Sequence, residues 1–378
     1  MRTRLITLLT TVLRAWFRGR AQPTPLAPRS ILILKACCLG DVLLTTPLIA
    51  TVRASYPEAQ ITYAVGPWSA PMVATSRHVD RVLMLPDRWT LGAWLATLHV
   101  LKQHHFDLVF VPDRSPTLTL LTWLADIPQR IGLDSAGRGF AYTHRVAVPS
   151  FVIHEAEQYS KLATSIGLAI PPRRLFFFPT PQAELHADLL IKQHHTIAGP
   201  LVVLHPGGGQ NPGMTLPRKR WFPERWANVA DSLIQRCNAQ ILLVGGPGDE
   251  EAVAAVAAAM QTPAPSFVRR WDWNELGALL QRCNLFLGHD TGMMHLATAV
   301  ATPTVAVFGP SDPQVYGPYS EQATFVWRPT YESPCFYNGI AEPTCPCSMQ
   351  CMANVEVDDV VSAAVTFLST SDKGSNDA

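Results

Sequence analysis

The sequence lacks any long hydrophobic run and has almost no excess of charge. No apolar stretch reaches the roughly eighteen residues that a membrane-spanning helix needs. Thirty basic and 29 acidic side chains leave a net charge of +1. So small a surplus argues against a general nucleic-acid binder, because such proteins depend on many Lys and Arg contacts to phosphate. With 23 Gly and 32 Pro in 378 residues, a collagen-like or low-complexity chain is excluded. The 48% of hydrophobic residues is ample for the cores of two to three domains.

Charge is concentrated at the start of the chain, where residues 1–30 contain six Arg and no Asp or Glu. The apolar stretch Leu5–Phe17 is interrupted by Arg14, and no clean small-residue cleavage site follows, which argues against a signal peptide. The pattern fits a basic amphipathic helix on an anionic membrane surface. A leader without function is the alternative.

Cysteine is scarce, with eight residues in the chain. A chain of this length needs no disulfide staples, and without a convincing secretory signal we expect reduced thiols. Four of them stand late in the chain: Cys335, Cys345, Cys347 and Cys351. Their spacing, C-x9-C-x-C-x3-C, lacks the paired C-x2-C that is typical of zinc sites. We interpret the group as free thiols, with a structural zinc site as the alternative.

Apolar runs alternate with helical patterns after the Pro-rich segment 22–28. The expected strands are Ser30–Lys35, Gln60–Val65, Arg81–Leu85, Leu108–Val111, Arg145–Val148, Leu201–Leu204, Gln240–Val244, Leu285–Leu287 and Thr304–Phe308. The helix after the first strand extends to Tyr56, with Pro47 either in a first turn behind Thr46 or at a kink. The other expected helices are Gln182–His195, Trp226–Cys237, Glu250–Met260 and His295–Val300.

Strands that alternate with helices in this way predict an α/β chain with parallel sheets covered on both faces. The pattern begins twice, so we expect two doubly wound domains that face each other across a cleft, with ligands at the carboxyl ends of the strands. The expected division is a leader and linker at 1–29, a first domain at 30–180, a second domain at 181–368 and a disordered tail at 369–378.

Loops after the predicted strands carry the candidate functional residues. Gly40 permits a tight turn after the first strand, and it places Asp41 at a helix N-terminus. A general base there would act mainly through its position, and a plain N-cap Asp is the structural alternative. The loop His205–Gly209 precedes Thr215 and the sequence Lys219-Arg-Trp221.

The glycines of that second loop, Gly208 among them, offer backbone N–H groups that can wrap a phosphate. Lys219 and Arg220 add positive charge, and we assign Thr215 to the same donor-binding group. The loop is neither G-x-G-x-x-G nor a Walker A sequence. Trp221 and Trp226 are interpreted as packing anchors.

Two further loops contain acids and glycines. In Gly245-Gly-Pro-Gly-Asp249-Glu250, either acid could accept hydrogen bonds from a ribose diol. Alternatively, both acids could simply stabilise the helix by their interaction with its dipole. In Gly288-His-Asp290-Thr291-Gly292-Met-Met-His295, Asp290 or Thr291 can cap a helix. Gly292 leaves the free N–H groups of its first turn open to an anion without a metal, and His295 can point at the same anion.

A resemblance to a known family rests on these loops. It is carried by ILILKACCLGDVLLTTP (31–47), by 201–231 with Lys219-Arg-Trp221, by Leu242–Gly246 and by GHDTGMMHLATAVATPTVAVFGPSDP (288–313). Over about residues 30–365 the chain resembles glycosyltransferase family 9, typified by the ADP-heptose:lipopolysaccharide heptosyltransferases. It departs from the family pattern in Cys37 and Cys38 before the Gly-Asp pair, and in the long loop around Asn211-Pro-Gly213.

The resemblance implies a GT-B fold of two Rossmann-like domains, with the acceptor bound mainly by the first and a nucleotide-sugar by the second. It implies an inverting enzyme without metal or cofactor, in which Asp41 is the general base. Lys219 and the backbone around Thr291 and Gly292 would contact the donor diphosphate. The remaining donor roles would fall to Asp249 or Glu250 (ribose), Asp290 (orientation of donor groups) and His295 (leaving group).

The leading hypothesis is a glycosyltransferase that moves a sugar, such as heptose from ADP-heptose, to a lipid-linked saccharide such as lipopolysaccharide core. It would be cytoplasmic and peripheral on the inner face of the cytoplasmic membrane, with residues 1–20 as the membrane contact and no nucleic-acid partner. The alternatives are a sugar-nucleotide epimerase or hydrolase of the same fold and a non-catalytic nucleotide-sugar binding protein. A dehydrogenase is disfavoured because no G-x-G-x-x-G follows either first strand.

Overall fold

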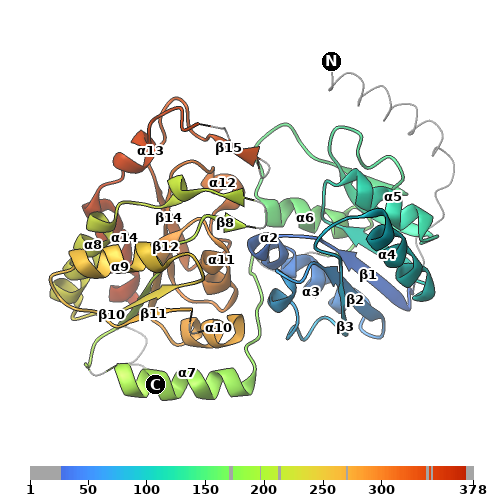
Figure 1. Cartoon of the computed structure of the whole chain (residues 1–378). Helices are drawn as coiled ribbons and strands as arrows, with labels where there is room; N and C mark the ends of the chain where they lie inside the picture. Colours follow the sequence, from blue (N-terminus) through green and yellow to red (C-terminus); the bar gives the residue numbers. More distant parts are fainter. Residues whose placement is uncertain are drawn as a thin grey trace. The chain divides into compact units, whose positions relative to one another are not determined.

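The chain folds into two compact units, Met1–Pro172 and Arg173–Ala378. The computed structural model describes residues 27–169, 173–195, 197–211, 214–269, 271–337, 340–341 and 344–371 (Figure 1). The amphipathic segment predicted within residues 1–20 lies outside the described residues. The second unit begins before residue 180 because Leu175 is fully buried and Phe177 donates its backbone N–H to the carbonyl of Ala299.

The first unit has a six-stranded parallel sheet in the order β3-β2-β1-β4-β5-β6. Its strands are β1 Ser30–Leu34, β2 Gln60–Val65, β3 Arg81–Met84, β4 Leu108–Val111, β5 Gln129–Asp134 and β6 His144–Ala147. Its helices are α2 Leu39–Leu44, α3 Thr46–Ser55, α4 Leu91–Gln103, α5 Pro116–Leu124 and α6 Glu155–Thr164, with a short η1 at Ala70–Met72. On one face Leu32, Leu34 and Val109 pack with residues of α4 and α5. The alternate residues Ile31 and Ile33 are equally buried, as expected where both faces of a sheet are covered.

The second unit repeats this plan in the order β11-β10-β7-β12-β13-β14. Its strands are β7 Leu201–Leu204, β10 Gln240–Gly245, β11 Ser266–Val268, β12 Leu285–His289, β13 Thr304–Phe308 and β14 Ala323–Trp327, with the two-residue pairs β8 Gln210–Asn211 with β9 Met214–Thr215 and β15 Phe336–Tyr337 with β16 Ile340–Ala341. Its helices are α7 Pro181–His194, α8 Pro223–Cys237, α9 Glu250–Ala259, α10 Trp273–Gln281, α11 Gly292–Ala299, α12 Pro313–Tyr316, α13 Gln350–Ala353 and α14 Val357–Ser371, with η2 at Pro217–Lys219. Residues of α8 and α14 share one core with alternate residues of the sheet.

Both sheets have the strand order 3-2-1-4-5-6 of a Rossmann fold, where the strands of each sheet are numbered along the chain. The order reverses between β1 and β4 in the first unit and between β7 and β12 in the second. Ligands of such sheets bind at the carboxyl ends of the strands where the order reverses. The prediction of two doubly wound α/β domains is confirmed, and each unit has one such edge.

Several sequence predictions were wrong in detail. The first helix is two helices, α2 and α3, with Thr45 between them and Pro47 in the first turn of α3. The strands β5, β11 and β14 were not expected. The helix α14 continues to Ser371, past the expected start of the tail at residue 369. Among the described residues, no helix is long and apolar enough to cross a membrane.

Gly132 in β5 is the position where an added methyl group should be most harmful to the first sheet. A Cβ there would lie 2.3 Å from the ring of Tyr142, which is buried. We expect Gly132→Ala to lower the free energy of unfolding by about 1–3 kcal/mol, because the ring must leave its place. Gly92→Ala in α4 is the control, since nothing lies within 4 Å of its Cβ, and it should stabilise the helix by about 0.5–1 kcal/mol. Urea unfolding checks both values, and equal midpoints for the two variants would contradict the packing argument.

Candidate functional site

Asp41 lies at the edge of the first sheet where the strand order reverses. It stands in the first turn of α2, and Cys38, not Asp41, is the N-cap residue. Its carboxylate lies 3.7 Å from the ammonium of Lys35, which follows β1 directly. The same ammonium lies 3.7 Å from Asp113, which follows β4. The alternative of a plain N-cap Asp is wrong, because Cys38 occupies the N-cap position. Charged residues from the ends of two neighbouring strands meet at this carboxylate instead.

A second layer of residues from α6 holds this arrangement. The hydroxyl of Tyr159 donates to Asp41 Oδ1 at 3.4 Å, and its ring lies 5.2 Å from the Lys35 ammonium. Arg114 donates to both carboxylate oxygens of buried Glu155, at 3.1 and 2.6 Å. Burial alone would lower the pKa of Lys35, but the surrounding carboxylates raise it. Lys35 therefore stays charged, while 32% of the Asp41 side chain remains exposed and can meet a substrate.

Cys37 and Cys38 correct the prediction that all thiols are reduced. The two adjacent residues form a disulfide in the structure, immediately before α2. The sequence argument considered disulfides between distant residues and the redox compartment. It did not consider a disulfide between two adjacent cysteines.

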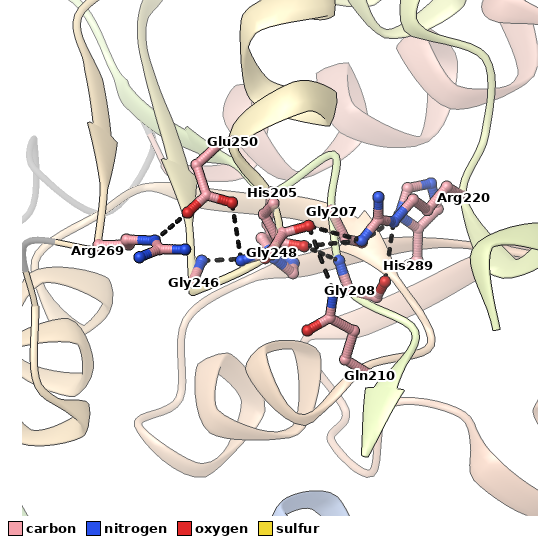
Figure 2. Close-up of polar contacts among 11 residues, drawn as sticks. His205, Gly207, Gly208, Gln210, Arg220, Gly246, Gly248, Glu250, Arg269 and His289 are labelled. Carbon is pink, nitrogen blue, oxygen red and sulfur yellow. Dashed lines mark hydrogen bonds and ion pairs between the residues drawn. The ribbon is translucent and has the colours of Figure 1, made fainter. Parts of the chain in front are cut away.

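In the second unit, the carboxylate of Asp249 connects the two glycine-rich loops, whose residues Gly208 and Gly246 are labelled in Figure 2. Its carboxylate accepts hydrogen bonds from the N–H groups of Gly208 at 2.7 Å and Gly246 at 3.0 Å. It also lies 3.1 Å from His205 Nε2 and 3.1 Å from Arg220 Nη2. Burial alone would raise the pKa of Asp249, but His205 and the N–H groups of Gly208 and Gly246 lower it to about 2. The carboxylate is only 7% exposed and is committed to positioning the loops.

Glycine is required where these loops approach the next strand. Gly208 has a φ of +93°, and a Cβ there would lie 2.3 Å from Thr291 Cγ2. Arg220 donates its Nε–H to the carbonyl of Gly208 at 2.9 Å. His205 Nδ1 is buried and has no hydrogen-bond partner within the part of the chain that the structure describes. The N–H of Gly208, predicted as a phosphate ligand, here donates to Asp249.

His289, at the end of β12, connects the segments beneath the site through hydrogen bonds. Its Nε2 accepts from the backbone N–H of Trp221 at 2.7 Å and from Trp226 Nε1 at 3.0 Å. Its Nδ1 therefore carries the proton and lies 3.2 Å from the carbonyl of Gly207. Burial lowers the pKa of His289 to about 3, so the ring stays neutral. The two Trp rings are buried edge to face, which confirms their role as packing anchors.

Asp290 and Lys219 form a buried ion pair beside α11, with Nζ and Oδ2 2.5 Å apart and each side chain 10% exposed. Burial alone would raise the pKa of Asp290, but the ammonium of Lys219 and the nearby His295 lower it. Thr291 is the N-cap of α11 and accepts from the N–H of Met294. Gly292 is the first residue of the helix. Asp290, Thr291 and Gly292 therefore stand at the N-terminus of α11. Lys219 is held beside them by its ion pair with Asp290.

The comparisons with known proteins agree with this geometry. The family profile described as glycosyltransferase family 9 (heptosyltransferase) matches residues 94–344, more than half of the chain. The chain belongs to glycosyltransferase family 9.

Relatives of this family-9 chain are similar over most of their length. Lipopolysaccharide heptosyltransferase 2 of Escherichia coli (strain K12) is 27% identical over 309 residues, which are 78% of this chain and 87% of the relative. Among solved structures, a family 9 glycosyltransferase from Veillonella parvula has a TM-score of 0.77 at 23% identity, covering 93% of this chain and 99% of that one. The E. coli ADP-heptose lipopolysaccharide heptosyltransferase II has a TM-score of 0.71 at 21% identity, covering 91% and 99%. The chain is thus a glycosyltransferase with a GT-B type of fold.

The remaining predicted residues, Thr215 and Glu250, are exposed on or beside the glycine-rich loops. Thr215 is exposed in β9. Glu250 accepts from the N–H of Gly248 and pairs with Arg269 (Figure 2). The sequence interpretation missed Lys35 and Glu155, because a single Lys at a strand end and an acid in a helix carry no motif. A charged residue directly after a buried strand was the available signal for Lys35.

Asp249 gives this glycosyltransferase an acid-sensitive step in stability. Its pKa is about 2 in the folded chain and 3.8 ordinarily, so the unfolded chain takes up the proton first as the pH falls. The ionised carboxylate of Asp249 contributes about 2 kcal/mol to the free energy of unfolding. This contribution is complete above pH 5 and is lost as the pH falls toward 2. Urea unfolding from pH 2.5 to 7 should show that the stability difference between wild type and Asp249→Asn shrinks by this amount on acidification. The exposed neighbour Glu250, as Glu250→Gln, should show a smaller change, and a pH-independent difference for Asp249→Asn would contradict the assignment.

Proposed function

We propose that this glycosyltransferase is an inverting, metal-independent heptosyltransferase that transfers heptose from ADP-heptose to a lipopolysaccharide core saccharide. The observation that carries the proposal is that relatives matched over 78% of the chain are named lipopolysaccharide heptosyltransferases. A solved structure at 20% identity and TM-score 0.64, an E. coli heptosyltransferase, is described with ADP-2-deoxy-2-fluoro heptose. This description supports an ADP-linked heptose as the donor.

On the donor side, we assign the diphosphate to the N-terminus of α11 and to Lys219. Free N–H groups in the first turn of a helix favour an anion, and Thr291 and Gly292 begin that turn. The carboxylate of Asp290 offsets the charge of Lys219, so Lys219 acts as an oriented donor within a neutral pair. His295 is 96% buried and near Asp290, where it supports the charge that develops on departing ADP.

The two acids of the third loop take different roles in this proposal. Asp249 positions the loops through its four contacts. Glu250 is the acid assigned to the ribose, because 45% of its side chain is exposed against 7% for Asp249. Gly208 and Thr215 would lie along the same donor.

On the acceptor side, Asp41 is assigned as the general base. A hydroxyl of the acceptor attacks the anomeric carbon, and its proton passes to the Asp41 carboxylate. The new C–O bond forms on the face opposite the diphosphate, the bond to ADP breaks, and the configuration inverts. Stabilisation of the departing diphosphate by preorganised donors is the larger contribution in many enzymes, and it can replace a divalent metal here. The base adds about 10²–10⁴-fold.

The acceptor in this proposal is a glycolipid, which would be met at the inner face of the cytoplasmic membrane. The six Arg of residues 1–30 would be attracted to anionic headgroups there. Pelleting of the full chain with phosphatidylglycerol vesicles, but not with phosphatidylcholine vesicles, would support this location.

Incubation of the purified chain with ADP-heptose and a heptose-deficient core oligosaccharide tests the function. We expect the acceptor to gain the mass of one heptose, an inverted anomeric configuration by NMR, and an unchanged rate in EDTA. Consumption of ADP-heptose without acceptor would instead indicate an epimerase or hydrolase. Donor binding without turnover over a panel of acceptors would indicate a binding protein.

A further inference from the structure

The four late cysteines come together in the second unit, on the segment between β14 and α14. We call Cys335, Cys345, Cys347 and Cys351 the thiol cluster. The sulfur of Cys347 lies 3.8 Å from that of Cys345 and 3.6 Å from that of Cys351. The backbone N–H of Met349 donates to Cys345 Sγ at 3.2 Å. All four are free cysteines, so three thiols stand in contact without a bond between them.

Cys347 is the member of the cluster that can react. Its side chain is half-buried, whereas Cys351 is 1% exposed. The backbone N–H of Cys351 and the thiols of Cys351 and Cys345 lower the pKa of Cys347 to about 7, while burial raises that of Cys351 to about 12. A thiolate therefore lies beside a thiol that keeps its proton. Since the thiolate is the nucleophilic form of cysteine, the cluster combines an attacking sulfur with a partner at contact distance.

Metal binding is the competing use of such a cluster. Considering only residues that the structure describes, no group of three or more His, Cys, Asp or Glu side chains is arranged to hold a metal ion. Cys345 and Cys351 each contact Cys347, and the spacing lacks a C-x2-C pair. The lack of such a group among the described residues and the spacing without a C-x2-C pair favour thiol chemistry over a zinc site.

We propose that Cys347 is an oxidation site for peroxides and that Cys351 converts the oxidised sulfur to a disulfide. The Cys347 sulfur attacks one oxygen of hydrogen peroxide, so an S–O bond forms, the O–O bond breaks, and the released hydroxide takes a proton to become water. The sulfur of Cys351 then attacks that of Cys347. The S–S bond forms, the S–O bond breaks, and the hydroxyl leaves with the thiol proton as a second water. Two thiols are oxidised and one peroxide is reduced to two waters.

The cluster is connected to Lys219 and Trp221 by two separate contacts. The indole Nε1–H of Trp221 donates to the carbonyl of Met352 at 3.1 Å, next to Cys351 in α13. Phe336 follows Cys335 directly, and its ring lies 4.3 Å from the Lys219 ammonium. A disulfide requires the sulfurs of Cys347 and Cys351 to approach to about 2.05 Å. This movement pulls on α13 and hence on Trp221, so oxidation should weaken ADP binding by about fivefold.

Peptide mapping of the wild-type protein tests the site without any variant. At pH 7, iodoacetamide should label Cys347 about tenfold faster than Cys237, because half of a thiol with a pKa near 7 is ionised. Cys237 is the matched control, since it is half-buried and burial raises its pKa. After peroxide treatment, mass spectrometry should find a Cys347–Cys351 linked peptide. The disulfide of Cys37 and Cys38 lies in a different peptide and does not interfere.

Variants separate the chemistry from its effect on the donor. Cys347→Ser should abolish both the linked peptide and the peroxide sensitivity of ADP binding, whereas Cys237→Ser should retain both. The ADP measurement rests on the proposed function, but the linked peptide does not, so the two can fail separately. Equal labelling of Cys347 and Cys237, or a Cys345–Cys347 link in place of the expected one, would overturn the proposal. So would one equivalent of metal in the purified protein that is lost in Cys347→Ser.

Discussion

Replacement of Asp41 by Asn is expected to lower the kcat of heptose transfer by about 10²–10⁴-fold and to leave the affinity for ADP unchanged. The amide keeps the size of the side chain and can still accept from Tyr159, but it cannot take the proton of the acceptor hydroxyl. Donor binding should survive because the residues assigned to ADP belong to the second unit. Steady-state transfer assays and titration calorimetry with ADP measure the two quantities.

Asp113 provides a matched control for this experiment. Its carboxylate lies at the same 3.7 Å from Lys35 as that of Asp41, but it is 17% exposed against 32%. Asp113→Asn should therefore disturb the charge around Lys35 as much as Asp41→Asn does, but it should lower the transfer activity much less. Equal losses for both variants would show that the charge balance around Lys35, and not a base at Asp41, controls the rate. Transfer by Asp41→Asn within a few-fold of wild type would remove Asp41 from the mechanism.

The strands that could be predicted are those in which burial and sequence pattern coincide. Leu201–Leu204 is apolar throughout and fully buried, as expected of a central parallel strand. The strand β5 was missed because it begins with Gln129 and Arg130, which are polar and yet buried. Arg130 is satisfied by backbone carbonyls, among them that of Ala141 at 2.8 Å. These bonds to backbone carbonyls form only in the folded chain, so a pattern of apolar residues cannot reveal them.

The candidate site shows the same division between local and distant information. A helix N-terminus after a strand is a local feature, and the sequence indicated it correctly for Asp41 and Thr291. The role of Asp249 was not predictable, because two of its partners, His205 and Gly208, lie about forty residues earlier in the chain. The sequence left Asp249 and Glu250 as equal candidates for the ribose. Only the folded chain shows that their exposed fractions differ, with 7% for the side chain of Asp249 and 45% for that of Glu250.

The ion pair of Lys219 and Asp290 likewise joins residues distant in sequence, since its members are 71 residues apart. Asp290→Ala should lower the free energy of unfolding by about 3–5 kcal/mol, because it leaves a buried ammonium without its partner. Lys219→Met should be harmful for the complementary reason, as the carboxylate then lacks its counter-charge. Urea unfolding of both variants measures these losses. A loss below about 1 kcal/mol would mean that water reaches the pair and that it behaves as a surface ion pair.

The double variant Lys219→Met with Asp290→Leu separates stability from catalysis. Apolar residues of similar volume often replace a buried ion pair at little cost, so the double variant should recover most of the stability that either single change removes. It should not recover ADP binding or heptose transfer, because no ammonium remains to meet the diphosphate. Recovery of both stability and activity would show that the pair only supports the fold. A double variant as unstable as Asp290→Ala would mean that packing around Phe336, whose ring lies 4.3 Å from the Lys219 ammonium, dominates the energy of this site.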